Sequence, residues 1–296
     1  MTDSTSIRPP AVAGLFYPGD AQALERTVDA LLDAARSAAA ADESPIRALV
    51  SPHAGYAYSG AVAARAFARL DDGAFDTVVL VGPSHVEAFD FASVFEGEAY
   101  RTPLGLVEVD AGLARRIAGG GKAIRLSQRG HVAPSRARGE HGLEVLLPFL
   151  QRVCAGGAHG TPRIVPVVMG NQDWDACAVL GRAVRETCDA EHTLVVASSD
   201  LSHFYPYEDA VRRDAVFCDE LATLDAARLF AAVRSGRCEA CGAGPVIATL
   251  IATAAWPDRR CQILARINSG DVTGERESVV GYASAIVTAP PVARAS

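Results

Sequence analysis

The chain has 296 residues, 49% of them hydrophobic, which is enough to bury the core of one large α/β domain or of two small ones. Its formal net charge is −7 and it has no run of lysine or arginine, which argues against nucleic-acid and anionic-membrane surfaces and favours a small-molecule or peptide partner. The first residues lack a signal-peptide pattern, and no window approaches the roughly 18 uninterrupted apolar residues of a membrane span. Seven cysteines at irregular spacing indicate free thiols in a reducing compartment, so we expect a cytoplasmic protein.

The first predicted elements are a helix, a strand and a second helix. Apolar residues recur at helical spacing from Ala21 to about Ala40. The apolar run that starts at Arg47 is too short for a helix, and it stops at a proline that His53 follows directly. The small residues that begin at Ser59 or Gly60 predict a helix packed closely on a sheet.

Two later strands also end at polar side chains. Thr77 to His85 is a β-branched run that breaks at a Gly-Pro pair and places His85 immediately after it. Thr193 to His203 ends in small polar residues, then Asp200 and the histidine itself. Loops from neighbouring strands converge at the carboxyl edge of an open α/β sheet, so we expect these imidazoles to meet His53 in one crevice.

A β insertion and a helix are predicted between these strands. Phe91 to Phe95 and Leu104 to Val109 have the pattern of a hairpin around a Pro-containing turn. Glu140 to Val153 is predicted to be a helix whose buried face carries His141, and Pro148 is expected to kink it or end it early.

The rest of the chain continues the βα alternation without an internal repeat, and its last residues, 288–296, are predicted to fray. Its predicted elements are a strand at Arg163 to Met169, a helix at Trp174 to Cys188, a strand at Thr193 to Ala197, one or two helices within Tyr207 to Phe230, an apolar helix at Gly244 to Trp256, and strands at Cys261 to Ile267 and Val279 to Val287.

A second chemical signal is the CxxC motif formed by Cys238 and Cys241. Such a motif serves as a redox dithiol or as half of a zinc site, or it has no chemical role. No second CxxC accompanies it, which disfavours a four-cysteine zinc site. Gly242 to Pro245 follows and opens an apolar helix, whose N-terminus would favour the thiolate of Cys241. The competing interpretation is a small buried residue at a tight turn.

Two imidazoles and a thiolate in one crevice would suit a transition metal, with His53, His85 and Cys241 as ligands of iron(II) or copper; zinc is also compatible. Three protein ligands leave coordination positions open, as in catalytic sites. The side chains expected to orient a ligand or shuttle protons beside the ion are Asp200, His203 and His141. A histidine beside a turn is more often a structural residue, and we assign no role to His131, His159 and His192.

Hydrolysis by a serine nucleophile is a third chemical possibility. Ser198 and Ser199 lie at the end of a predicted strand, where such nucleophiles occur. The flanking residues lack the glycine pattern of a nucleophile elbow, which disfavours this mechanism.

Six motifs occur in order between Arg8 and Pro245: RPPAVAGLFYP, SPHAGYAYSG, GPSH, EHGLEVLLPFL, SSDLSHF and CGAGP. In combination they resemble the Memo family, whose bacterial and archaeal members are called AmmeMemoRadiSam system protein B. The family's fold is similar to that of the class III extradiol dioxygenases. This resemblance implies a single α/β domain over residues 1–296, with a central, mostly parallel mixed sheet flanked by helices, and a pocket at the carboxyl edge.

The resemblance also implies roles for the candidate residues. His53, His85 and Cys241 match the family's metal-site positions, and Asp200 and His203 match polar residues of the same pocket. The dioxygenases have a carboxylate as their third ligand, whereas a thiolate at this position shifts the preference towards copper(I).

Two functions are therefore compatible with the sequence. One is a non-haem iron- or copper-dependent oxidoreductase that acts on dioxygen or on an unidentified small substrate. The other is a non-catalytic adaptor that binds a peptide or a partner protein, because vertebrate Memo proteins are described as signalling adaptors that recognise phosphorylated peptide. The prokaryotic name also implies a radical-SAM enzyme and an AMMECR-type protein as partners.

Overall fold

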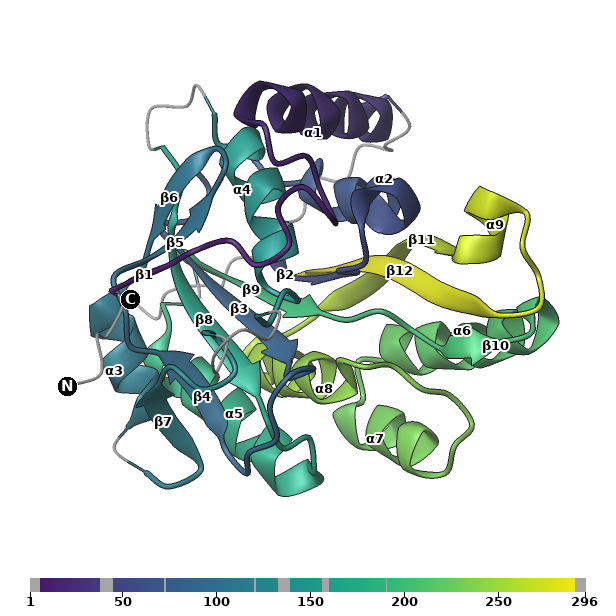
Figure 1. Cartoon of the computed structure of the whole chain (residues 1–296). Helices are drawn as coiled ribbons and strands as arrows, with labels where there is room; N and C mark the ends of the chain where they lie inside the picture. Colours follow the sequence, from purple (N-terminus) through teal and green to yellow (C-terminus); the bar gives the residue numbers. More distant parts are fainter. Residues whose placement is uncertain are drawn as a thin grey trace.

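A computed structural model describes residues 6–37, 45–71, 73–119, 121–132, 139–155, 160–189 and 191–290 of the chain. Within these residues the chain forms one large mixed sheet with helices on both faces and a small three-stranded sheet beside it (Figure 1). The predicted α/β class is confirmed. Within the described residues, no helix is both long enough and apolar enough to cross a membrane.

The large sheet is parallel at its centre. In spatial order its strands are β10 (His203–Tyr205), β12 (Val279–Thr288), β2 (Ile46–Ser51), β9 (Thr193–Ser198), β3 (Thr77–Pro83), β8 (Arg163–Met169), β4 (Ala92–Phe95) and β7 (Ile124–Ser127), and β11 (Arg260–Asn268) pairs with β12. Strands β2, β9, β3 and β8 run parallel to one another, whereas β12 is antiparallel to β2 and β4 is antiparallel to β8. The carboxyl ends of β2, β9 and β3 therefore lie side by side.

Successive residues of the central strands point into two different hydrophobic cores. In β2, Ala48 and Val50 belong to the core on one face and Leu49 to the core on the other. The helices that supply the first core are α3 (Ala111–Ala118), α5 (Trp174–Thr187), α6 (Tyr207–Ala222), α7 (Ala226–Arg234) and α8 (Ala243–Ala252), and those that supply the second are α1 (Ala21–Arg36), α2 (Tyr56–Phe67) and α4 (Leu147–Val153). Figure 1 shows α1, α2 and α4 above the sheet and α5, α7 and α8 below it. Burial on both faces explains why these strands are continuous apolar runs.

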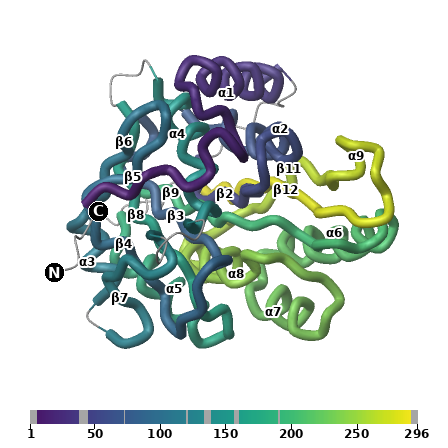
Figure 2. Tube along the Cα trace, in the orientation of Figure 1, coloured from purple at the N-terminus to yellow at the C-terminus, as the bar shows by residue number. Residues whose placement is uncertain are grey.

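The predicted hairpin exists, but one of its two strands is different. Its turn joins β5 (Ala99–Thr102) to β6 (Gly105–Glu108), and β1 (Ile7–Arg8) pairs parallel with β5. Phe91 to Phe95 was the wrong partner, because β4 is buried along its whole length and lies between β7 and β8 in the large sheet. From the small sheet the amino-terminal segment runs along the molecule towards α1 and α2 (Figure 2).

The predicted helix from Glu140 to Val153 is shorter than expected. A 3₁₀ turn at Glu144–Leu146 leads into α4, and Pro148 lies in the first turn of α4. Proline is compatible with that position because the first helical N–H groups have no partner within the helix. Pro148 therefore starts the helix instead of ending it, and His141 lies in the loop that precedes it.

Several other boundaries differ by a few residues from the prediction. The second helix begins at Tyr56, and the segment after Pro206 forms two helices, α6 and α7. The elements α3, β7, β10 and α9 (Ser269–Thr273) were not predicted. Thr288, where fraying was expected to begin, is the last residue of β12, and the N–H of Ala289 donates to the carbonyl of Pro45. The end of the predicted tail, residues 291–296, lies outside the described residues.

Candidate metal centre

The candidate site is built on the carboxyl ends of three adjacent parallel strands. His53 follows β2 by two residues, His85 follows β3 by two residues, and Asp200 follows β9 by two residues. Strand β9 lies between β2 and β3 and pairs with both, with Ser51 opposite Ser198 in the register. The predicted convergence of these three loops is therefore present in the structure.

Three imidazoles face one another in this pocket. The ring centroids of His53 and His85 are 5.0 Å apart, and that of His141 lies 5.8 Å from the first and 5.1 Å from the second. One nitrogen of each ring lies within 4.8 Å of the other two, a spacing that allows the three residues to hold one metal ion. His141 points inward as predicted, although a loop carries it and not a helix. Its ring packs edge-on against that of Phe16, with centroids 4.7 Å apart.

Cys241 reaches the pocket from the N-terminus of α8. Its Sγ lies 3.3 Å from Nε2 of His53, and it also accepts the backbone N–H of Asp200 at 3.3 Å. Cys238 does not pair with it, because all seven cysteines of the chain are free. The structure therefore brings Cys241 to His53, whereas the three-residue group that could hold an ion contains His141 in place of the thiol.

Two features of the site oppose the effect of the helix N-terminus on the Cys241 thiol. Burial and the negative charge of Asp200 raise the pKa of Cys241 well above its ordinary value. The helix N-terminus compensates only in part, because the N–H of Gly242 donates to Oγ of Ser199 and that of Gly244 to Oε1 of Gln172. The backbone N–H groups of Gly242 and Gly244 therefore donate to other oxygens, in addition to any stabilisation of a negative charge on the Cys241 sulfur.

Burial keeps two of the imidazoles neutral. It lowers the pKa of His53 to about 3, with a further lowering by the nearby His85, and it lowers the pKa of His141 to about 4. For His85, burial also acts to lower the pKa, but the hydrogen bond and charge of Glu140 outweigh it and raise the pKa. A neutral imidazole has a lone pair available for a metal, so His53 and His141 are in the ligand form at neutral pH.

The two other predicted polar residues differ in their contacts. The carboxylate of Asp200 accepts the backbone N–H of His53 at 2.8 Å, and its Oδ2 lies 3.9 Å from Nε2 of that residue. His203 lies close enough to influence the charge of both His53 and Asp200. Glu239 accepts the N–H of His203 and the hydroxyl of Tyr205, so its carboxylate is held beside β10.

Two further residues of the site have contacts that sequence reasoning missed, although Ser198 was considered there as a nucleophile. Oε1 of Glu140 lies 2.9 Å from Nδ1 of His85, and Oγ of Ser198 lies 2.8 Å from Nδ1 of His53. Both residues lie within motifs described above: Glu140 begins EHGLEVLLPFL, directly before His141, and Ser198 begins SSDLSHF, two residues before Asp200. Their contacts to the other strand ends are tertiary, and no local pattern encodes them.

The remaining histidines have other surroundings. His131 is buried between the hydroxyl of Tyr100 at 2.6 Å and the carbonyl of Ser93 at 2.9 Å, which is a structural arrangement. His192 is exposed beside Asp76 at the start of β9. His159 lies outside the described residues.

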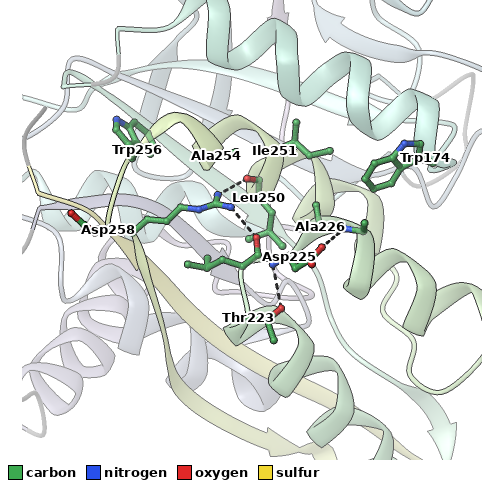
Figure 3. A pocket seen from close by; sticks show the side chains of 12 residues that line it. Trp174, Thr223, Asp225, Ala226, Leu250, Ile251, Ala254, Trp256 and Asp258 are labelled. Atoms are coloured by element: carbon green, nitrogen blue, oxygen red, sulfur yellow. Dashed lines mark hydrogen bonds between the residues drawn. The ribbon is translucent and has the colours of Figure 1, made fainter.

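An open hollow of about 690 Å³ lies elsewhere, between the ends of α6 and α8 (Figure 3). It includes Trp256, whose ring packs under the guanidinium of Arg47 near the amino end of β2 and therefore far along the strand from His53. Its polar groups cap helices: Arg259 donates to the carbonyls of Leu250 and Leu224, and Asp225 accepts the first N–H groups of α7. Arg259 and Asp225 therefore have structural roles at these helix ends.

Comparison with known proteins agrees with this fold. Residues 8–286 match the family described as Memo-like protein. A MEMO1 family protein of Methanothermobacter thermautotrophicus is 37% identical over 286 residues, which cover 94% of this chain and 99% of the relative. A MEMO1 family protein of Methanopyrus kandleri is 32% identical over 287 residues, with 94% and 98% covered. The crystal structure of an uncharacterized protein from Escherichia coli K12 superposes with a TM-score of 0.52 at 15% identity, covers 82% of this chain and 99% of that one, and so shares the fold. The chain belongs to the Memo-like family.

Proposed function

We propose that this protein binds one transition-metal ion, iron(II) or copper, between His53 and His85 and acts as an oxidoreductase on dioxygen or on a small substrate. The observation that supports it is the group of three imidazoles, each with a nitrogen within 4.8 Å of the others, at the carboxyl edge of the sheet. Imidazole is a good ligand for iron, copper and zinc, so the residues fit such an ion. The bound ion would supply Lewis acidity and a change of oxidation state.

The side chains around the proposed ion differ in their access to solvent. His53 is buried, whereas the side chains of His85 and His141 are 28% and 20% exposed. A substrate therefore approaches from the side of His85 and His141. His141 is neutral at neutral pH, so its ring can accept a hydrogen bond from a substrate at that side. Asp200 holds the backbone of His53 and Ala54, which keeps the buried imidazole oriented towards the pocket.

The proposal has two candidates for the third ligand, Cys241 and His141. Replacing Cys241 by serine is expected to weaken copper(I) binding far more than iron(II) binding, because a hydroxyl is a hard ligand that is not ionised at neutral pH. Competitive titration of both metals without oxygen measures this difference. Cys238→Ser is the matched control, since that thiol is packed in the core. Unchanged copper(I) affinity in Cys241→Ser would assign the third position to His141.

A second candidate function, non-catalytic recognition of a peptide or a partner protein, is supported by apolar side chains next to the site. The exposed side chains are Leu15, Tyr58, Val86 and Phe204. Val86 follows His85, Phe204 follows His203, and Leu15 precedes Phe16, whose ring packs against His141. Phe204 is 75% exposed and has a φ of 64°, a backbone conformation that bulky residues rarely adopt. Radical-SAM and AMMECR-type proteins are the proposed partners.

One assay separates the two functions. The chain is loaded with one equivalent of iron(II) or copper(I), and its consumption of dioxygen is measured with the partner proteins absent and present. Turnover by the isolated chain supports the oxidoreductase. Stoichiometric metal without turnover, together with partner binding that Phe204→Ser weakens while metal affinity is unchanged, supports the adaptor.

A further inference from the structure

The two imidazoles at the centre of the site each have one nitrogen engaged outside the pocket. Nδ1 of His85 lies 2.9 Å from Oε1 of Glu140, and Nδ1 of His53 lies 2.8 Å from Oγ of Ser198. The nitrogen that remains on each ring is Nε2. A neutral imidazole has one N–H and one lone pair, so the partner of Nδ1 decides which nitrogen can act as a ligand.

The contacts of Glu140 define the proton position on His85. Its Oε1 also accepts the backbone N–H groups of His141 and Gly142, each at 2.8 Å, and its Oε2 accepts the backbone N–H of His85 at 2.5 Å. A buried carboxylate that accepts several amide hydrogens is an acceptor only. The remaining contact must then be a donation from Nδ1–H of His85, which leaves the lone pair on Nε2.

The single hydroxyl hydrogen of Ser198 determines which nitrogen of His53 carries the proton. The hydroxyl of Ser198 donates to the carbonyl oxygen of Gly142, and a carbonyl has no hydrogen to give in return. A serine hydroxyl has only one hydrogen, so its contact with Nδ1 of His53 must be one in which the imidazole donates. Nε2 of His53 is therefore the nitrogen with the lone pair, and it is the atom that faces Sγ of Cys241 at 3.3 Å.

We infer that Glu140 and Ser198 are positioning residues that fix His53 and His85 in the Nδ1–H tautomer and so present both Nε2 lone pairs to the ion. Both act through one short segment, since Glu140 supplies the carboxylate and Gly142 supplies the carbonyl that holds Ser198. The same segment carries His141. This inference rests on the proposed metal site for its function, but the tautomers themselves are properties of the chain without metal.

The first test uses the unmodified full-length chain, freed of metal and labelled with ¹⁵N in its histidine rings. Long-range ¹H–¹⁵N correlation spectra distinguish Nδ1–H from Nε2–H imidazoles, and they are recorded at alkaline pH, where His85 is neutral although Glu140 raises its pKa. We expect His53 and His85 both to show the Nδ1–H pattern. An Nε2–H pattern for either ring would overturn the inference for that residue. This measurement needs no variant, so a failure of a mutant to fold cannot obscure it.

The second test uses Ser198→Ala and Glu140→Gln. Ser198→Ala is expected to shift His53 towards the Nε2–H form and to leave His85 unchanged; Glu140→Gln is expected to affect His85 and not His53. Loss of such a partner of a metal ligand lowers metal affinity by roughly 10- to 100-fold, which titration with iron(II) or copper(I) measures. Ser284→Ala is the matched control, because Ser284 is a buried serine whose hydroxyl has no hydrogen-bond partner within the described residues.

The outcomes separate this inference from the proposed function. Unchanged tautomers and unchanged affinity in Ser198→Ala would overturn the role of Ser198. The expected tautomers in a chain that binds neither metal would support the inference and overturn the metal-dependent function. Equal loss of affinity in Ser198→Ala and Ser284→Ala would show that packing alone, and not the proton position, accounts for the effect.

Discussion

Replacing His85 by alanine is expected to abolish tight binding of a transition metal while the fold stays intact. The side chain is 28% exposed and lies in a loop after β3, so its removal costs little packing, but it removes one of three imidazole nitrogens that face the same point. Titration of the purified variant with one chosen metal measures the loss, and a thermal melt confirms that the chain is folded. His53→Ala is expected to have the same effect on binding, with a larger effect on stability because His53 is buried.

Two other histidines provide the comparison. His203→Ala should lower metal affinity less than His85→Ala, because its ring is beside the pocket and outside the group that could hold the ion. His192→Ala should leave affinity unchanged, since that exposed residue lies at the opposite end of β9. An equal loss of metal affinity in His53→Ala, His85→Ala and His203→Ala would show that His203 has been wrongly placed outside the group of metal ligands.

The second large effect is expected on stability, from a buried ion pair that fastens the amino-terminal segment to the loop before α4. Nη1 of Arg8 lies 2.7 Å from Oε2 of Glu144, and the two side chains are 2% and 0% exposed. Glu144 also accepts the backbone N–H groups of Ala11 and Val12 and the hydroxyl of Tyr17. Arg8→Ala would leave this carboxylate buried without its cation, which typically costs about 3–5 kcal/mol. Urea denaturation followed by circular dichroism measures the free energy of unfolding.

An exposed ion pair is the control for this prediction. Arg163 and Glu108 lie 3.9 Å apart with both side chains largely exposed, so Arg163→Ala is expected to change stability by less than about 1 kcal/mol. The double variant Arg8→Ala, Glu144→Ala should lose less than the sum of the two single variants, because it leaves no charge unpaired. A strictly additive double variant would contradict the assignment of the loss to an isolated buried charge.

The sequence predicted the part of the site that depends on strand ends. β-branched runs that stop at proline or small polar residues place His53, His85 and Asp200 at one edge of the sheet, and the structure has them there. Local pattern cannot tell which strands become neighbours. For this reason Phe91 to Phe95 was paired with the wrong strand, although its apolar pattern was recognised.

The site's electrostatics depended on contacts that are distant in sequence. A cysteine before an apolar helix predicts a low pKa, but in the structure Asp200 and burial act in the opposite direction on Cys241. The partner of His85 is Glu140, 55 positions away, and the partner of His53 is Ser198, 145 positions away. Such pairs form only when the sheet assembles, so residue type and local spacing do not reveal them.

The order of strands in the sheet has a consequence for when the proposed metal site can form. Strands β2 and β3, which lead to His53 and His85, do not touch each other, because β9 lies between them and pairs with both. During synthesis the ribosome delivers β2 and β3 first, and β9 begins only at Thr193. Until β9 is inserted, no sheet hydrogen bonds hold the two loops side by side, and Cys241 follows later still. The nascent chain therefore lacks the site, and binding of the proposed metal ion would follow translation and folding of most of the chain.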